Sequence, residues 1–229
     1  MAEVLNLVFD LDGTLIDSAP QIHAAANIVF GSKGFPPLSQ DTVRGFVGNG
    51  LGVLVSRSMA YLGIAPDESL HAELMAEFIK IYEEAFDLTV LYPGVSTALT
   101  ELSAAGRRLA ICTNKPLGPT RAVLHHFGLS GLFPVVIGGD SLPQRKPDPA
   151  PLRAALQALG PGKALFIGDS EVDAETARAA GVPLVLFSGG YRKTAAETLG
   201  ATIIFDDHAA LPGLIDQLAP GLQAARAGN

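Results

Sequence analysis

Apolar positions along the chain predict two kinds of region. Short, continuous apolar runs predict buried strands near residues 5–9, 108–113, 134–137, 164–168, 183–187 and 202–205. From residue 93 onward, these runs alternate with segments at helical spacing near 95–105, 116–127, 149–158, 171–181 and 207–218. Alternation of this kind favours a parallel sheet with right-handed crossovers. Because the runs lack polar alternation, the sheet is expected to be covered on both faces.

Residues 16–86 follow a different pattern, with no convincing strand. Ser18, Ser39 and Asp67 are typical of residues that cap the start of a helix, and Pro20 suits a first turn. A further helix is predicted near 51–62. Apolar residues then recur at mostly helical spacing between acidic ones, at Leu70, Leu74, Phe78, Ile81 and Phe86. We therefore predict a helical insertion between the first strand and the alternating region.

Polar clusters follow three of the predicted strands. They are Asp10-Leu11-Asp12-Gly13-Thr14, Thr113-Asn114-Lys115 and Gly168-Asp169-Ser170-Glu171-Val172-Asp173. Ligands of open α/β sheets bind beyond the carboxyl ends of the strands. A buried carboxylate pair costs several kcal/mol unless a cation neutralises it. Asp10 and Asp12 are therefore candidates for a metal site, and one of them for a nucleophile. The alternative is an Asp-Gly turn without chemistry.

Composition narrows the classes of partner. The chain has 229 residues, is 48% hydrophobic and carries a net charge of −7 without a basic run. This balance argues against nucleic acid and anionic membranes as partners. The single cysteine, Cys112, excludes an intrachain disulfide and is expected to be an inert buried thiol. We see no signal peptide or membrane-spanning stretch, so a cytoplasmic protein is expected. The residues beyond Ala219 are expected to be frayed.

The ordered motifs resemble those of the haloacid dehalogenase-like hydrolase superfamily. They match at Asp10 to Thr14, Thr113, Lys146 in a Pro-rich loop, and Asp169 to Asp173. Within the superfamily, residues 10–20, 46–50 and 138–147 are most similar to phosphoglycolate phosphatases. The resemblance implies a Rossmann-like core of residues 1–15 and 87–229, with its five main strands in the order 5-4-1-2-3. Residues 16–86 would form a helical cap that closes on the segments near 14–17 and 87–93.

The same resemblance implies roles for the core residues. Asp10 would be the nucleophile that forms an aspartyl-phosphate, and Asp12 the general acid and base. Asp10, Asp12, Asp169 and Asp173 would hold Mg²⁺, with Asp12 using its backbone carbonyl and Asp173 a bound water. Thr113, Asn114 and Lys146 would bind the phosphate, and Lys146 would also act in catalysis by neutralising the Asp10 carboxylate and the phosphate. Each residue also has an ordinary structural interpretation: a turn at Asp12, a helix start at Asp173, an N-cap at Thr113 and a solvated lysine at 146.

Substrate choice is expected to come from the cap. Gly48-Asn49-Gly50 precedes a predicted helix and offers free N–H groups to an anionic substrate tail. Arg44 is a candidate substrate-binding cation, and Arg57 lies nearby, although surface solvation is the alternative for both. Asn49 completes the set of cap residues expected to contact the substrate.

We therefore predict a Mg²⁺-dependent phosphatase for a small anionic phosphomonoester, foremost 2-phosphoglycolate, and allow for a homodimer. Residues 189–194, Gly-Gly-Tyr-Arg-Lys-Thr, depart from the segment expected in many phosphoglycolate phosphatases, so another small phosphorylated metabolite remains open. A β-phosphoglucomutase-like phosphosugar mutase would share Asp10 and Asp12. A binding protein on the same fold is the non-enzyme alternative.

Overall fold

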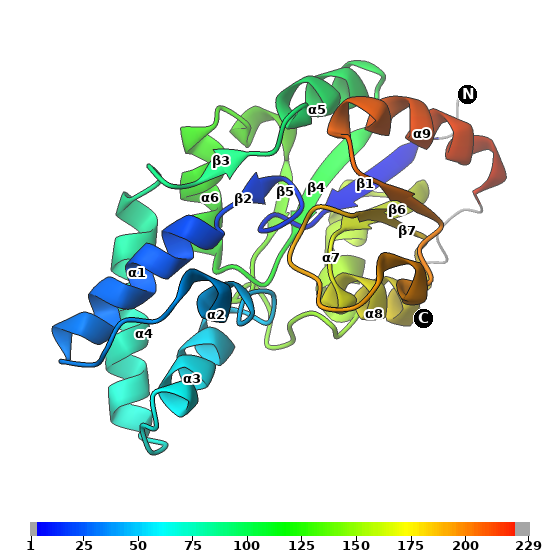
Figure 1. The fold of residues 1–229 in the computed structure, drawn as a ribbon. Helices are drawn as coiled ribbons and strands as arrows, with labels where there is room; N and C mark the ends of the chain where they lie inside the picture. The colour runs from blue at the N-terminus through cyan, green and yellow to red at the C-terminus, as the bar shows by residue number, and fades with distance from the viewer. Residues whose placement is uncertain (1–3, 223–229) are drawn as a thin grey trace.

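A computed structural model describes residues 4–222 and shows one parallel sheet beside a helical unit (Figure 1). The sheet has the order β5-β4-β1-β6-β7-β8. Its strands are β1 (Leu5–Phe9), β4 (Arg108–Cys112), β5 (Val135–Ile137), β6 (Lys163–Gly168), β7 (Leu184–Phe187) and β8 (Ile203–Phe205). The expected order 5-4-1-2-3 is present with one addition, because β8 pairs with β7 and makes a sixth strand at the edge.

Helices cover both faces of this sheet. The helices of the core are α5 (Val95–Ala104), α6 (Leu117–His126), α7 (Ala150–Leu159), α8 (Glu171–Ala180) and α9 (Leu211–Leu218). Leu7 and Phe9 of β1 pack in one cluster with α5, α6 and α9, whereas Val8 packs in a second cluster with α7 and α8. Successive strand residues point to opposite faces, so an unbroken apolar run fills both clusters, as predicted.

The predicted helical insertion is confirmed as four helices with their own apolar core. They are α1 (Ala19–Ser32), α2 (Gln40–Arg44), α3 (Leu51–Tyr61) and α4 (Glu68–Glu84). The side chains of Ser39 and Asp67 accept hydrogen bonds from Thr42 N and Leu70 N, so both predicted N-caps are confirmed. Ser18 is the N-cap residue of α1 with Pro20 in the first turn, as predicted, but its hydroxyl makes no capping bond and instead donates to Asp12 Oδ1 at 2.6 Å.

Residues 16–86 are not entirely free of strand. β2 (Ile16–Asp17) pairs antiparallel with β3 (Val90–Leu91), so that two short segments run side by side between the sheet and the helices. Each strand has two residues, too short for periodicity to reveal, and the pairing arises from the two connections passing each other. The division into a core of 1–15 and 87–229 and a cap of 16–86 stays a prediction. Below, "cap" names residues 16–86.

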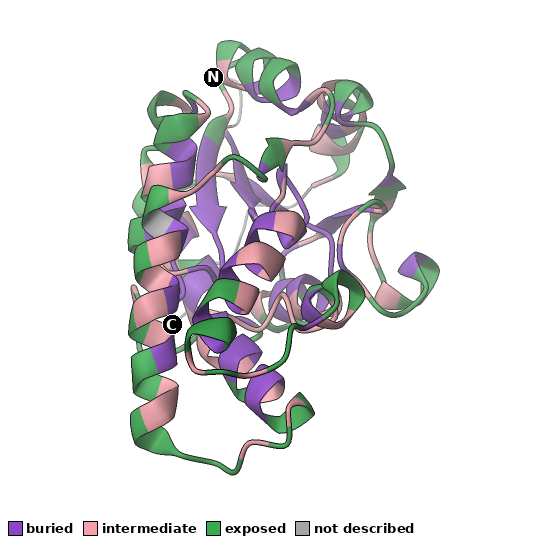
Figure 2. Ribbon diagram, turned by 60° about the vertical axis from the view of Figure 1, so that its left-hand side comes forward, coloured by how far each residue is buried: buried purple, intermediate pink, exposed green. Residues whose placement is uncertain are grey.

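Burial follows this architecture. The strands and the inward sides of the helices are buried, and the outward sides are exposed (Figure 2). Cys112 is buried, and burial raises the pKa of its thiol to about 12, in line with an inert thiol. Short 3₁₀ helices complete the described chain at Ser130–Leu132, Ala196–Leu199, His208–Ala210 and Ala219–Gly221. The expected frayed tail falls largely outside the described residues. No helix among those described is long and apolar enough to span a bilayer.

Candidate active site

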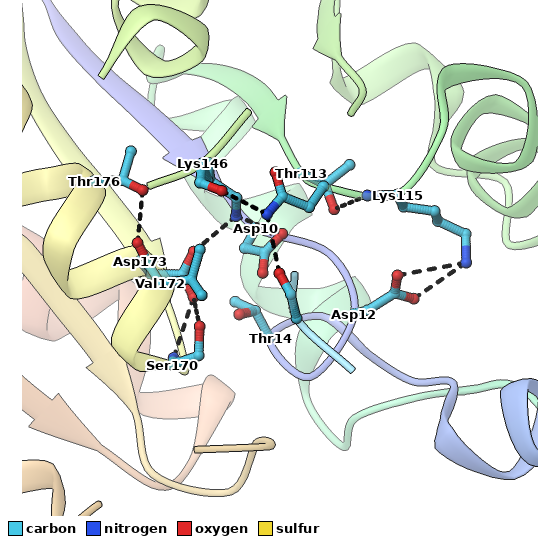
Figure 3. A network of polar contacts seen from close by, with 12 residues as sticks. Asp10, Asp12, Thr14, Thr113, Lys115, Lys146, Ser170, Val172, Asp173 and Thr176 are labelled. Atoms are coloured by element: carbon cyan, nitrogen blue, oxygen red, sulfur yellow. Dashed lines mark hydrogen bonds and ion pairs between the residues drawn. The ribbon is translucent and has the colours of Figure 1, made fainter. Parts of the chain in front are cut away.

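The polar clusters at the strand ends meet at one edge of the sheet. Asp10 follows β1, Thr113 follows β4 and Asp169 follows β6. Because β1 lies between β4 and β6 and all three strands are parallel, their carboxyl ends are adjacent. All three side chains are buried, and Figure 3 shows two of them, Asp10 and Thr113, in one polar network. The sheet topology thus brings together residues that are far apart in sequence.

Lys146 lies at the centre of this network. Its Nζ is 2.9 Å from Asp10 Oδ1 and 2.7 Å from Asp173 Oδ1 (Figure 3). Burial disfavours its charge, but Asp10 and Asp173 outweigh this effect and raise the pKa of Lys146. The side chain is 1% exposed, so it is a fixed cation and not a solvated loop lysine.

Asp173 also shapes the start of α8. Its Oδ2 accepts hydrogen bonds from the backbone N–H groups of Asp169 and Ser170, at 3.2 and 3.1 Å, and from Ser170 Oγ at 2.7 Å. The structural interpretation of this residue, an acid in the first turn of a helix, is therefore correct. Its other oxygen binds Lys146, so the same carboxylate fixes both the loop and the buried cation.

Three carboxylates form a candidate metal centre. Asp10, Asp169 and Asp173 each place one oxygen within 4.8 Å of the others. Burial raises the pKa of Asp169 well above its usual range, and Asp173 and Asp10 add to the effect. Burial likewise raises the pKa of Asp10 to about 6, although Lys146 opposes it. Crowding of buried carboxylates disfavours their charged forms, and a hard divalent cation with oxygen ligands would relieve it. The donor set therefore fits a divalent cation.

The side chain of Asp12 turns away from that centre. Its carboxylate accepts a hydrogen bond from Ser18 Oγ and lies 3.2 Å from Lys115 Nζ. Lys115 is buried, and its ammonium lies 3.5 Å from the centre of the Tyr82 ring of α4. The sequence analysis placed Lys115 in a polar cluster but gave it no role. Its signal was its place at the end of β4, where a charged residue in an otherwise buried segment needs a partner.

Thr113 and Asn114 follow β4 on the same edge. The N-cap interpretation of Thr113 is wrong, because α6 starts after Pro116 and has no side-chain capping bond. Thr113 Oγ1 instead accepts a bond from Lys115 N at 3.3 Å. Asn114 Nδ2 donates to Gly48 O at 3.0 Å and to Lys146 O at 2.9 Å. Asn114 thus joins the cap loop to the lysine loop of the core.

Two cavities open beside Asp10 and Asp12. The first is lined by Gly48 and Gly50 of the cap and by Thr113, Asn114 and Lys115 of the core. The second, of about 310 Å³, is lined by Asn49 of the cap and by Asp169, Tyr191 and other residues of the core. The predicted cap loop 48–50 therefore lies at the site.

The two cap arginines lie elsewhere. Neither Arg44 nor Arg57 lines these two cavities. The Arg44 guanidinium lies 5.2 Å from the centre of the Tyr191 ring and donates to Gly190 O at 3.3 Å. Arg44 thus joins the cap to the segment 189–194, and its predicted role in substrate binding stays a prediction.

Comparison with known proteins defines the class. A family model described as haloacid dehalogenase-like hydrolase matches residues 7–187, and the chain belongs to this family. A phosphoglycolate phosphatase of Cereibacter sphaeroides is 49% identical over 93% of this chain and 98% of its own length. One of Rhodospirillum rubrum is 44% identical over 94% of this chain and 92% of its own length.

A solved structure agrees. A predicted phosphoglycolate phosphatase from Haemophilus somnus superposes with a TM-score of 0.87 at 32% identity, covering 93% of this chain and 99% of that one. CbbY from Rhodobacter sphaeroides, solved in complex with phosphate, superposes with a TM-score of 0.75 at 26% identity, covering 90% and 95%. The family resemblance seen in the motifs is thus confirmed.

Proposed function

We propose that this chain hydrolyses 2-phosphoglycolate to glycolate and phosphate with Mg²⁺ as cofactor. The observation that carries the proposal is the buried ion pair of Lys146 with Asp10 at the end of β1, beside the crowded carboxylates of Asp169 and Asp173. The relatives named phosphoglycolate phosphatase, which this chain matches almost end to end, support the choice of substrate.

Asp10 is the proposed nucleophile. Its carboxylate oxygen attacks phosphorus, the ester P–O bond breaks, and an aspartyl-phosphate and an alkoxide result. Lys146 neutralises the carboxylate and the incoming phosphate, whose oxygens Thr113 and Asn114 help to position. Water then attacks the acyl phosphate and restores Asp10. Asp12 gives its proton to the leaving oxygen and takes one from the attacking water, held for both steps by Ser18.

The proposed metal ligands are the carboxylates of Asp10 and Asp169 and the backbone carbonyl of Asp12, with Asp173 binding through water. Mg²⁺ would neutralise phosphate charge at this point. Thr14 and Tyr191 orient Asp169, because Thr14 Oγ1 donates to Oδ1 at 2.8 Å and Tyr191 N to Oδ2 at 2.7 Å. The Asp169 carboxylate is therefore held by the fold before an ion arrives.

A panel of small phosphomonoesters ranked by kcat/KM tests this proposal. The panel contains 2-phosphoglycolate, 3-phosphoglycerate, β-glucose 1-phosphate and 2-hydroxyethyl phosphate, each with Mg²⁺ or with EDTA. We expect release of inorganic phosphate, fastest from 2-phosphoglycolate, only with the metal. Turnover of β-glucose 1-phosphate without phosphate release, dependent on a bisphosphate activator, would instead identify a mutase. No turnover of any ester would favour a binding protein. The cytoplasmic location, the homodimer and the absence of nucleic-acid partners stay predictions.

A further inference from the structure

We propose that Lys115 determines substrate specificity by binding the carboxylate of the substrate in the cavity below the cap. The inference rests on the proposed phosphatase function and names the group that reads the non-phosphate half of the ester. The sequence analysis gave no role to Lys115, which it placed in a polar cluster, and did not name its partner Tyr82. The two residues come together where α4, which carries Tyr82, packs near the start of α6, which Lys115 precedes.

Lys115 is a buried cation with unused donors. Its side chain is 4% exposed, and its ammonium lies 3.2 and 3.5 Å from the two oxygens of Asp12. An ammonium has three N–H donors, and one carboxylate does not occupy all of them. Lys146 contrasts with it, because that ammonium lies within 3 Å of two carboxylates. Figure 3 shows Lys115 reaching Asp12 from the side opposite to Lys146.

Tyr82 adds a second polar group that is free to form a hydrogen bond with a ligand. The residue is 5% exposed, and its ring packs under the Lys115 ammonium. Its buried hydroxyl has no hydrogen-bond partner of normal geometry among the described residues, although Ser18 lies near it. An unpaired buried hydroxyl is unfavourable, so a polar atom of a ligand would satisfy it. Lys115 from the core and Tyr82 from the cap thus face the same small space.

The cavity around these groups suits a compact anion. Lys115 is the one basic residue among the described residues that line it, and the lining also includes the apolar side chains of Ile22, Leu51, Leu54 and Phe78. Its volume is about 40 Å³. A water needs roughly 10–15 Å³ by the same measure, so the space holds about three or four water-sized groups. The four heavy atoms of a CH₂–COO⁻ group match this size, whereas a hexose ring exceeds it.

The position of the cation decides what it recognises. Asp10 and Asp12 line both cavities, and in the proposed binding mode the phosphate lies on Asp10 while the rest of the ester enters the smaller cavity, toward Lys115 and Tyr82. A carboxylate there would take the free donors of Lys115 inside an apolar wall, where ionic hydrogen bonds are strong. An ester with a neutral tail would leave those donors unused. A site built for a polar group discriminates strongly against ligands that lack it.

The test compares, in one variant, two esters of nearly equal size that differ in the charge of the tail. 2-Hydroxyethyl phosphate carries CH₂OH where 2-phosphoglycolate carries the carboxylate. We expect Lys115→Met to lower kcat/KM for 2-phosphoglycolate by at least 100-fold and for 2-hydroxyethyl phosphate by less than about 5-fold. Tyr82→Phe should lower only the first, by up to about 10-fold. Lys80→Met, an exposed lysine on α4 that lines neither cavity, is the matched control and should change neither value.

Several results would overturn the inference. Equal losses on both esters would show that Lys115 acts on Asp12 or on folding, and no loss would place the carboxylate elsewhere. If Lys115→Met does not fold, Lys115→Arg, whose bulkier head fits the cavity poorly, must reduce the preference for 2-phosphoglycolate at least 10-fold; an unchanged preference refutes the inference. Failure of the unmodified protein to prefer 2-phosphoglycolate over 2-hydroxyethyl phosphate would instead refute the substrate of the proposed function.

Discussion

The site has two regions, one around the buried Lys146 and one around the buried Lys115, and different structural elements form them. Around Lys146, the carboxylates of Asp10 and Asp169 follow directly after strands, and Asp173 lies in the first turn of α8. Around Lys115, Asp12 comes from the loop after β1, but the Tyr82 ring comes from α4 of the cap, where this helix meets the start of α6. Strand ends fix atoms through the hydrogen bonds of the sheet. A helix contact can be re-formed with different side chains without disturbing the sheet.

The charge balance of the regions differs as well. Near Lys146, three buried carboxylates face one ammonium, so this region has an excess of negative charge that suits a cation. Near Lys115, one ammonium faces one carboxylate and a neutral tyrosine. The first region is suited to chemistry with a metal and a phosphate, and the second to recognition of a further anionic group. With the roles proposed above, reaction and selectivity should be separable by mutation.

The largest effect is expected at Asp10. Asp10→Asn should lower kcat by at least about 10⁴-fold on every phosphate ester, because an amide is a poor nucleophile and a weak ligand for a hard cation. Asp216→Asn, an exposed carboxylate on α9 paired with Arg107, is the control and should keep full activity. Steady-state kinetics together with circular dichroism will check this. A folded Asp10→Asn protein with substantial turnover would exclude the covalent mechanism.

A second prediction concerns stability near Lys146. Lys146→Met leaves the buried carboxylates of Asp10 and Asp173 without their cation, so in EDTA the free energy of unfolding should fall by about 3–5 kcal/mol. Asp216→Asn, at the surface pair, should cost less than about 1 kcal/mol. Urea unfolding at pH 7.5 measures both. Similar losses in the two variants would mean that the buried pair contributes no more than a surface pair.

Sequence analysis revealed the first region far better than the second. Asp10, Thr113 and Asp169 each follow an apolar run, so periodicity located both the strands and the residues at their ends. The helices were located by apolar residues at helical spacing. β8 was predicted as a strand, although it was not assigned a place in the sheet. Local patterns are sufficient where the backbone itself positions the side chain.

The second region depends on tertiary contacts that no local pattern contains. Tyr82 occupies an apolar position of α4, and only packing against the start of α6 places its ring under Lys115. Ser18 was expected to cap α1, but the nearby Asp12 carboxylate binds its hydroxyl. Arg44 lies against the Tyr191 ring, a contact that its position in the sequence did not indicate. Long side chains choose among several partners, and the choice depends on distances set by the whole fold.

A third prediction separates contacts that hold the cap from contacts that recognise substrate. The Tyr191 hydroxyl accepts hydrogen bonds from Ser18 N and Ala19 N and donates to Asp17 Oδ1, so it joins the core to the start of α1. Tyr191→Phe should lower kcat/KM by roughly 5- to 20-fold, equally for 2-phosphoglycolate and 2-hydroxyethyl phosphate, since three hydrogen bonds at the lower end of their usual net contribution are together worth about 1–2 kcal/mol. Arg44→Ala should give a smaller loss, again equal for the two esters. A loss confined to 2-phosphoglycolate in Arg44→Ala would restore that arginine as a substrate ligand.

The smallest effect on substrate preference is expected at His208. This residue holds the backbone of the loop after β1 through Thr14. The ring is buried against Tyr92 and Phe187, and its Nε2–H donates to Thr14 O at 2.9 Å. Burial lowers its pKa below the usual 6.5, although the bond to Thr14 opposes this shift. The unfolded chain therefore takes up a proton near pH 6.5, whereas the folded chain does so only at lower pH. The contribution of His208 to the free energy of unfolding is therefore full well above pH 6.5 and decreases as the pH falls below about 6.5.

His208→Gln tests this sign, because glutamine keeps an N–H donor and has no titratable ring. Between pH 7.5 and 5.5, the unmodified protein should lose about 1 kcal/mol more unfolding free energy than the variant, since one pH unit corresponds to at most about 1.4 kcal/mol for one proton. Urea unfolding at both pH values in EDTA measures the difference. Carboxylates that titrate in the same range contribute to both proteins and cancel. The ratio of kcat/KM for the two esters should not change at either pH. A changed ratio would mean that the region around Lys146 and the cavity at Lys115 are energetically coupled. Mutations could then not change reaction and selectivity independently.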